Sequence, residues 1–379
     1  MRIKNLVKSA IVFLPFFLPF FILRFSVGPI PTTLLEVLIL LIFFVNLCFS
    51  NIKFRWSWFL FFALIFILAG LTSALIDPNV TAGLGLFKAY FIDGFLVYLM
   101  VVSLSDSQKE SFFDFLILSG IVASLGALIL YFQDVRSLDG RIVDFSLLSS
   151  NYLAMYLSPL LVLAITKIRK DLSPKTIFFT LASILFLVVI YLTRSRGVII
   201  SAVPALIYLA YLAVKQKTLL RKIVFLLLAV AFFVGGYLYF RPDWSDAGRK
   251  ATSSNVRYYI WLTSVEMIGE NPLLGVGLSN YQKYFTDLTS DRVNYLEFIA
   301  PQALTAHNIF LQIYLTTGFL GLVSFVALVG LVLFKCRKKQ YMAFLIAILA
   351  YGLVDTPFFR NDLAILFWIA LAVCYEDRN

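Results

Sequence analysis

The sequence predicts an all-α, polytopic integral membrane protein with about twelve transmembrane helices and one large outer (periplasmic) loop that contains short helices. Of the 379 residues, 61% are hydrophobic and 14% are charged, whereas a soluble domain is about 45–50% apolar and about 25% charged. Apolar stretches recur at about the 20-residue length that crosses a bilayer. Lys and Arg collect in alternate connections, which explains the net charge of +11 without nucleic acid as a partner.

The apolar stretches divide the chain into three parts. We expect residues 1–240 to form transmembrane helices 1–9, residues 241–304 the large periplasmic loop, and residues 305–379 helices 10–12. No small-residue cleavage site follows the first stretch, so it is expected to be a span and not a removable signal peptide. The expected spans are 9–27, 31–50, 56–75, 83–103, 111–132, 147–166, 174–193, 197–214, 221–240, 305–334, 340–355 and 361–375.

The charges of the connections predict the orientation. Segments such as "KIRKDLSPK", "KQKTLLRK" and "KCRKK" are rich in Lys and Arg, and such segments stay in the cytoplasm. Both termini are then cytoplasmic, and the connections "QDVRSLDGRIVDFS" and "DTPFFRND" lie outside together with the long loop. We therefore expect a multi-pass membrane protein whose long loop lies on the outer side.

The long loop is expected to contain a helix over Asn255–Gly269, "NVRYYIWLTSVEMIG". "NPLLGVG", with Pro272, Gly275 and Gly277, should end it, because proline and glycine interrupt helices. One face of this helix is defined by helical spacing and consists of Val256, Tyr259, Ile260, Thr263 and Met267.

No metal ion or cofactor is expected. His307 is the only histidine, so a histidine-rich metal site is excluded, and Cys48, Cys336 and Cys374 show no CxxC spacing. The chain also lacks a phosphate-binding loop, an HExxH motif and a GxSxG motif, each of which would predict a specific chemistry.

His307, followed by Asn308, stands at the head of the apolar run "TAHNIFLQIYLTTGFLG". Ionisable groups within membrane segments are costly, and they are therefore candidates for a functional site. On a helix, the residues below His307 would be Leu311, Tyr314 and Gly318, and glycine there would allow close approach of another element. The alternative is an interfacial histidine that anchors a helix end.

Several cations are predicted on the same outer side. Arg194 and Arg196 in "TRSRG" form a fork suited to a phosphate or diphosphate, with contact to anionic lipid headgroups as the alternative. Arg257 lies four residues before Trp261, so the two side chains could instead form a cation–π pair.

Lys88 and Arg141 complete this set of predicted cations. Lys88 lies within a span five residues before Asp93, a spacing that does not favour a direct pair, and snorkelling to the outer headgroups is its alternative. Arg141 lies in an outer loop, where a solvated surface position is the alternative. The shared side predicts one site for an anionic substrate, facing away from the cytoplasm.

The motif of His307-Asn308, nine residues, and Gly318-Phe319-Leu320-Gly321 resembles the H-[NSQ]-x9-G-x-x-G signature of the O-antigen ligase family. That family is grouped with O-antigen polymerases and bacterial O-oligosaccharyltransferases. "TRSRG" and "RYYIWLTSVEMIGENPLLGVG" resemble its Ser-Arg-Gly and its Arg-x3-Trp followed by Pro-x2-Gly-x-Gly. The match is specific over about residues 190–325.

The resemblance implies a GT-C-type membrane glycosyltransferase that is metal-independent and inverting. The donor would be a glycan on undecaprenyl diphosphate, and the acceptor would be lipid A–core or another glycan at the outer face of the inner membrane. His307 would be the general base, and Arg196 and Arg257 would grip the diphosphate. Further substrate-binding candidates are Arg194, Lys88, Arg141 and Asn308.

The implied chemistry suits these residue types. A diphosphate is already a good leaving group, so it needs fixed positive charge and no acid, and arginine stays charged at any working pH. A base for the acceptor hydroxyl should titrate near the operating pH, as imidazole does.

Other functions stay open. An O-antigen or other polysaccharide polymerase needs the same donor site, and protein-glycosylating and teichuronic-type enzymes share the chemistry. A glycolipid flippase or transporter belongs to another class and is disfavoured because we find no internal repeat. A non-catalytic scaffold leaves the shared placement of His and Arg unexplained.

Overall fold

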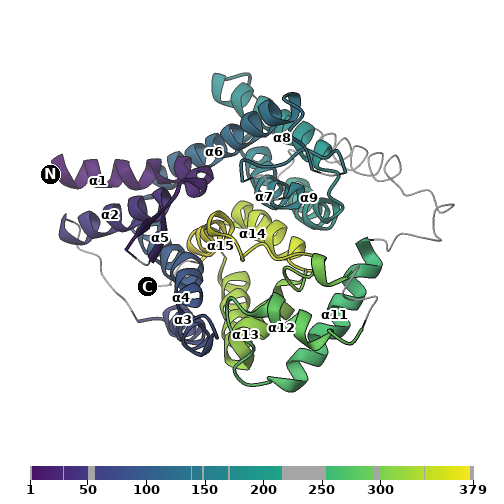
Figure 1. Cartoon of the computed structure of the whole chain (residues 1–379). Helices are drawn as coiled ribbons and strands as arrows, with labels where there is room; N and C mark the ends of the chain where they lie inside the picture. The colour runs from purple at the N-terminus through teal and green to yellow at the C-terminus, as the bar shows by residue number, and fades with distance from the viewer. Residues whose placement is uncertain are drawn as a thin grey trace.

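The computed structural model describes residues 2–28, 30–49, 56–137, 139–146, 149–169, 171–215, 253–292, 299–336 and 338–375, and these are almost entirely helical (Figure 1). The first half contains α1 (Arg2–Phe13), η1 (Leu14–Ile22), α2 (Leu34–Phe49), α3 (Trp58–Ile76), α4 (Val80–Phe87), η2 (Lys88–Ile92), α5 (Asp93–Val102), α6 (Asp106–Phe132) and α7 (Ser150–Lys167). The second half contains α8 (Pro174–Thr193), α9 (Gly197–Lys215), α11 (Ser253–Glu270), α12 (Tyr281–Leu288), η5 (Ala300–Gln302), α13 (Ile309–Lys335), α14 (Lys339–Tyr351) and α15 (Asn361–Cys374).

A helix occupies the place of each predicted span except 221–240, which lies outside the described residues together with 241–252. Within the described part of the chain, six helical segments are long and apolar enough to cross a membrane. Four shorter apolar helices are α2, α9, α14 and α15. These findings agree with an all-α membrane protein, while the count of twelve spans and the large periplasmic loop stay predictions. The six segments are Ile3–Ile22, Trp58–Ile76, Val80–Val102, Asp106–Phe132, Pro174–Thr193 and Ile309–Lys335.

A β-hairpin separates the first two predicted spans, so their predicted boundaries at 27 and 31 are wrong. Strands β1 (Arg24–Val27) and β2 (Ile30–Thr33) pair antiparallel, with Val27 opposite Ile30. Pro31 cannot donate a backbone hydrogen bond, which disfavours helix here. Pro15 and Pro19 also lack a backbone N–H, and the α-helix α1 ends just before them and continues as the 3-10 segment η1.

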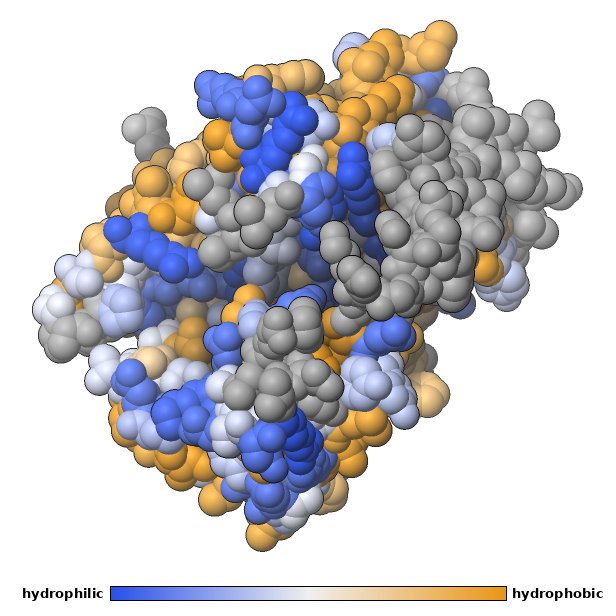
Figure 2. Space-filling model, turned by 45° about the vertical axis from the view of Figure 1, so that its right-hand side comes forward, coloured by the Kyte–Doolittle hydropathy of each residue, from blue (hydrophilic) through white to orange (hydrophobic). Residues whose placement is uncertain are grey.

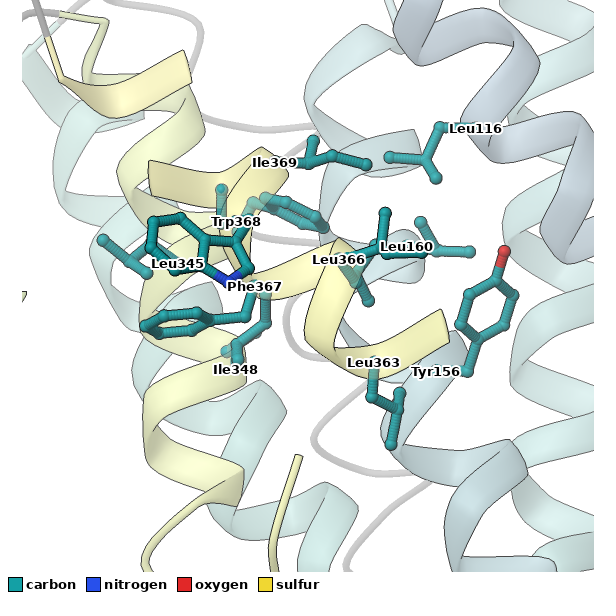
Figure 3. Packing of buried hydrophobic residues seen from close by; sticks show 14 of the residues in the cluster. Leu116, Tyr156, Leu160, Leu345, Ile348, Leu363, Leu366, Phe367, Trp368 and Ile369 are labelled. Carbon is teal, nitrogen blue, oxygen red and sulfur yellow. The ribbon is translucent and has the colours of Figure 1, made fainter. Parts of the chain in front are cut away.

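The centre of the bundle is α15, which lies beside α14 between the α1–α6 group and the α11–α13 group (Figure 1). Residues 362–374 of α15 are all buried, as expected for a helix that is apolar on every side. Trp368 packs against Phe95 and Tyr98 at ring-centroid distances of 5.6 and 6.2 Å. Figure 3 shows side chains of α15 directed toward both α14 and α7.

Helix α13 is broken at Gly318, which has φ 70° and ψ −172°. The "NPLLGVG" loop fills this break: the Phe319 N–H donates to the Leu273 carbonyl at 3.2 Å, and the Val276 N–H donates to the Leu315 carbonyl at 2.7 Å. A Cβ on Gly318 would overlap the Leu273 oxygen, and a Cβ on Gly275 would overlap the Leu315 oxygen. The carbonyl of Thr316 accepts from the Ser73 hydroxyl on α3, so the break is hydrogen-bonded from two sides.

The predicted span 305–334 is thus wrong at its start and in its continuity, since α13 begins at Ile309 and is interrupted. The predicted loop helix is confirmed as α11, which is a few residues longer than expected. The face that helical spacing defines is buried in the structure except at Tyr259, which is 42% exposed. The buried members of this face are Val256, Ile260, Thr263 and Met267.

We expect Gly318→Ala to lower the unfolding temperature, because a backbone in this region strains any other residue by about 1–3 kcal/mol and the new Cβ meets the Leu273 carbonyl. The matched control is Gly330→Ala in the same helix, where an added Cβ has nothing within 4 Å. Thermal unfolding of both purified variants in detergent checks this. Equal midpoints for the two variants would contradict the docked-loop interpretation.

Candidate functional site

His307 lies in the short connection between η5 and α13, with a positive φ of 46°. A non-glycine residue in this region is uncommon and often marks a functional site. The preceding Ala306 is held on both sides: its N–H donates to Gln312 Oε1 at 2.6 Å, and its carbonyl accepts from Trp261 Nε1 at 3.0 Å. Helices α11 and α13 therefore fix the position of the histidine together.

Asn308 is the N-cap of α13. Its Oδ1 accepts from the N–H groups of Phe310 and Leu311 at 3.0 and 3.1 Å, which satisfies two donors at the start of the helix. Its Nδ2 donates to the Leu353 carbonyl at 3.0 Å, and the Ile309 N–H donates to the Gly352 carbonyl at 2.7 Å. These bonds dock the α14–α15 connection against His307.

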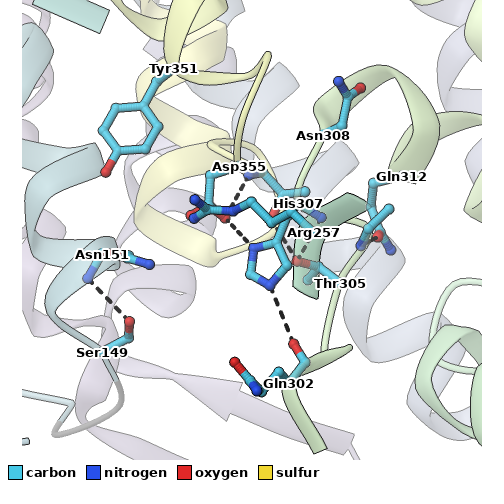
Figure 4. A network of polar contacts seen from close by, with 12 residues as sticks. Ser149, Asn151, Arg257, Gln302, Thr305, His307, Asn308, Gln312, Tyr351 and Asp355 are labelled. Carbon is cyan, nitrogen blue, oxygen red and sulfur yellow. Dashed lines mark hydrogen bonds and ion pairs between the residues drawn. The ribbon is translucent and has the colours of Figure 1, made fainter. Parts of the chain in front are cut away.

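That connection supplies Asp355, which joins the histidine to an arginine (Figure 4). Asp355 Oδ1 lies 3.2 Å from His307 Nδ1, and Asp355 Oδ2 lies 3.5 Å from Arg257 Nη2. The Asp355 side chain is only 5% exposed, whereas His307 and Arg257 are 21% and 20% exposed. The carboxylate thus forms the inner layer of the site, and the imidazole and guanidinium form its accessible surface.

The hydrogen-bonding positions of the His307 ring follow from its neighbours. A carboxylate only accepts hydrogen bonds, so Nδ1 carries the hydrogen that points to Asp355. Nε2 faces the Gln302 carbonyl at 3.3 Å. A ring that has taken up a proton can donate to both groups, while a neutral ring leaves Nε2 free to accept.

Arg257 retains donors for a ligand. Its Nε atom is buried and has no hydrogen-bond partner among the described residues, and the contact of Nη2 with Asp355 at 3.5 Å is long. The indole N–H of Trp261 donates to the Ala306 carbonyl and not to a partner shared with Arg257. Asp355 therefore positions the guanidinium through Nη2, and the other N–H groups of Arg257 are not used in this contact.

Arg194 and Arg196 flank the turn between α8 and α9, and both are exposed. Arg194 adopts a left-handed conformation with φ 50° at the end of α8. Between them, the Ser195 hydroxyl lies 2.7 Å from the Tyr351 hydroxyl. The Asp355 N–H donates to the Tyr351 carbonyl at 3.1 Å. The turn therefore contacts Tyr351 at the end of α14, and Tyr351 is in turn hydrogen-bonded to Asp355.

Arg141 lies at the same end of the bundle. The Ile142 N–H donates to the Leu192 carbonyl at 3.3 Å, and Arg141 and Arg257 both lie within electrostatic range of Tyr351. Arg141 Nε pairs with Asp139 at 2.6 Å. Burial would raise the pKa of Asp139, but hydrogen bonds from Arg141 and Ser137 outweigh it, so this pKa is lowered.

Lys88 belongs to a different set of contacts. Its Nζ lies 2.8 Å from Glu36 Oε2 and donates to the Pro31 carbonyl at 2.7 Å. It therefore pairs with Glu36 on α2 and not with Asp93, in agreement with the sequence spacing. The structure links His307 with Arg257 directly and leaves Lys88 with the β-hairpin and α2.

The sequence interpretation missed Asp355 and Arg360. Both lie in "DTPFFRND", and the signal that selected Arg194 applied to them too: a charged residue in a short connection between apolar stretches. Arg360 is buried, with ion pairs to Asp144 and to Asp362, the latter at 2.6 Å. Burial would lower the pKa of Arg360, but the charges of Asp362 and Asp144 outweigh it and raise this pKa.

The hydrophilic surface and the available metal-ligating side chains indicate which ligands the protein could bind. On the face shown in Figure 2, hydrophilic residues gather around a hollow across the middle of the molecule. Among the described residues, no group of three or more His, Cys, Asp or Glu side chains could hold a metal ion. Metal independence stays a prediction.

Comparison with known proteins gives a consistent result. Residues 181–326 match the family model described as O-antigen ligase. This part of the chain is therefore similar to the O-antigen ligase family. It is also 29% identical over 272 residues to the O-antigen ligase of Salmonella typhimurium strain LT2, covering 69% of this chain and 66% of that protein.

The resemblance found in the sequence motifs is thereby confirmed. The matched residues 181–326 include Arg194, Arg196, Arg257, His307 and Asn308. Lys88, Arg141 and Asp355 lie outside residues 181–326, so the His307–Asp355 contact joins the matched segment to the connection between α14 and α15.

Arg360→Met should destabilise the fold strongly, because removing one partner of a buried ion pair leaves uncompensated charge and costs about 3–5 kcal/mol. The control is Arg292→Met, which removes a surface pair with Glu266 worth about 0–1 kcal/mol. Unfolding midpoints in detergent would compare the two. If Arg360→Met unfolded at the same temperature as Arg292→Met, the buried network would not hold this connection.

Proposed function

We propose that this protein transfers a glycan from undecaprenyl diphosphate to an acceptor sugar, in the manner of an O-antigen ligase with lipid A–core as acceptor. The reaction takes place at the periplasmic face of the inner membrane, and both termini are cytoplasmic. The supporting observation is the Asp355 carboxylate that joins the only histidine to Arg257, in a chain whose residues 181–326 match the O-antigen ligase family.

Arg257 is proposed to bind the diphosphate. Its guanidinium is partly exposed and Nη2 makes a long contact with Asp355 at 3.5 Å, and charged donors stabilise the negative charge that develops on a leaving diphosphate. Arg196 and Arg194 would supply further charge from the α8–α9 turn, and Arg141 from its loop. Arginine suits all these positions because it remains charged and binds phosphate through two donors.

His307 is proposed as the general base, with Asp355 as its positioning residue. The hydrogen bond from Nδ1–H to Asp355 fixes the ring and leaves Nε2 for the acceptor hydroxyl, which would replace the Gln302 carbonyl 3.3 Å away. The acceptor oxygen then bonds to the anomeric carbon while the bond to the diphosphate oxygen breaks. The proton moves to Nε2, the electron pair leaves with the diphosphate, and one displacement inverts the configuration.

The roles of Lys88 and Asn308 rest on the resemblance. Lys88 is paired with Glu36, so a ligand would have to share it with that carboxylate. Asn308 caps α13 and binds the Leu353 carbonyl, so we propose that it acts on the substrate through the placement of His307.

Reconstitution tests the reaction class. The purified protein in liposomes receives undecaprenyl diphosphate-linked glycan and lipid A–core, with and without a chelator. We expect glycan on lipid A–core, free undecaprenyl diphosphate, and the same rate with chelator. Lengthened carrier-linked chains would establish a polymerase instead, loss of product with chelator would defeat metal independence, and transport without bond formation would exclude a transferase.

Site variants should show graded losses in that assay. His307→Ala removes the base and should lower kcat by about 10²–10⁴-fold, and His307→Arg should not restore it. Asp355→Asn removes a charged hydrogen bond worth about 1.5–3 kcal/mol, which corresponds to about 10–100-fold. Asp287→Asn, which alters an exposed pair with Lys283, is the control. Full activity of His307→Ala would rule out the histidine as base.

A further inference from the structure

One exposed face of α11 is apolar. Tyr258, Leu262 and Val265 are 57%, 48% and 59% exposed, and their spacing of four and three residues places them in one row along the helix. The opposite face is buried in its own core with Val276, Phe285 and Leu315. A helix on a water-exposed surface normally turns polar residues outward, so this row requires another explanation.

The apolar row continues into a helix that is long and apolar enough to cross the membrane. Past the end of α11, Leu273 and Leu274 are 73% and 53% exposed. The Leu273 carbonyl binds the N–H of Phe319 in α13, and Phe319 and Leu320 are themselves 52% and 54% exposed. We call these exposed residues together the apolar strip, consisting of Tyr258, Leu262, Val265, Leu273, Leu274, Phe319 and Leu320.

Charged groups mark one margin of the apolar strip. Glu266 pairs with Arg292 at 2.7 Å, and Glu270 accepts from the Tyr284 hydroxyl at 2.7 Å. On the helix these two acids lie to one side of the row from Tyr258 to Val265. The strip itself contains no charged residue. A tyrosine within an apolar surface is typical of the membrane interface, where aromatic side chains are enriched.

We propose that α11 lies in the outer leaflet with the apolar strip in lipid, so that the bilayer itself sets the depth of the site. This inference rests on the proposed function for the identity of the leaflet and of the donor. Lipid is the occupant that the strip fits, because the strip includes exposed residues of α13, which is long and apolar enough to cross the membrane. A second copy of the chain would have to cover α11 and the lipid-facing side of α13 together.

The position of α11 has a consequence for Arg257, which directly precedes Tyr258 in the sequence. A helix in the interface holds the backbone of Arg257 at headgroup level, the depth at which the diphosphate of a membrane-anchored carrier lies. The carrier can then reach the guanidinium by lateral diffusion within the leaflet. Asp355 fixes the direction of the guanidinium, and the apolar strip fixes its depth relative to the lipid headgroups.

Depth measurements on nitroxide labels test this inference directly. Cys48, Cys336 and Cys374 are first replaced by alanine, and single cysteines are then introduced as Leu262→Cys, Leu273→Cys and Gln282→Cys. Gln282 is the control because it is exposed on α12 outside the strip. In liposomes we expect the Leu262 and Leu273 labels to collide with oxygen, which enters lipid, and to be protected from a water-soluble nickel complex. The Gln282 label should show the reverse.

Two results would overturn the inference. Equal nickel accessibility of the Leu262 and Gln282 labels would place α11 in water. Protection from both agents, with dipolar broadening between labels of neighbouring molecules, would show that a second copy covers the strip. Neither result depends on activity, so a protein that passes the depth test and transfers no glycan refutes only the proposed function.

A second measurement connects depth to donor use. Leu262→Glu should raise the KM for the lipid-linked donor in liposomes and leave kcat within about twofold, since the Leu262 side chain lies on the exposed face of α11. Gln282→Glu is the charge-matched control and should leave both constants unchanged. Equal KM values for the two variants would contradict a role of the strip in donor access.

Discussion

The carboxylate of Asp355 is the contact on which the proposed site depends. It is buried, and its two oxygens face a histidine and an arginine that come from different segments. A buried carboxylate is costly without partners of opposite charge or hydrogen-bond donors. Because His307 and Arg257 meet that need, the acid also determines the direction in which each side chain points. The proposed base and the arginine proposed to bind the diphosphate are thereby held side by side.

Backbone hydrogen bonds also join the segment that carries Arg257 to α13. Helix α13 is broken at Gly318, and the "NPLLGVG" loop supplies the partners for the backbone groups that the break leaves free. Unpaired backbone groups are expensive within a membrane, so the loop and the helix require each other. On the far side of the loop, Asp77 accepts from the Ser279 N–H at 2.6 Å and from its hydroxyl at 2.8 Å. The segment that carries Arg257 is thus joined to α3 and to α13.

Particular residues show which features of the fold and the site could be predicted from the sequence. Hydropathy located the described helices, and helical spacing grouped the residues of α11 that are buried in the structure, together with the exposed Tyr259. The motifs located His307 and Arg257, which the structure links through one acid. Asp355 was missed because a single acid in a short connection has no spacing that distinguishes it from a solvated one. The break in α13 was missed because a lone glycine in an apolar run is compatible with a continuous helix, and its partner loop lies about 40 residues away in the sequence.

The sequence by itself predicted the membrane class, the positions of the described helices and the resemblance to the O-antigen ligase family, because these depend on local composition and on residue types at short spacing. Only the tertiary structure decided which charges are neighbours: Lys88 joined Glu36, Arg360 became buried between Asp144 and Asp362, and Asp355 joined His307. Such pairings depend on how distant helices pack, and side chains at helix ends select their partners only once that packing is formed.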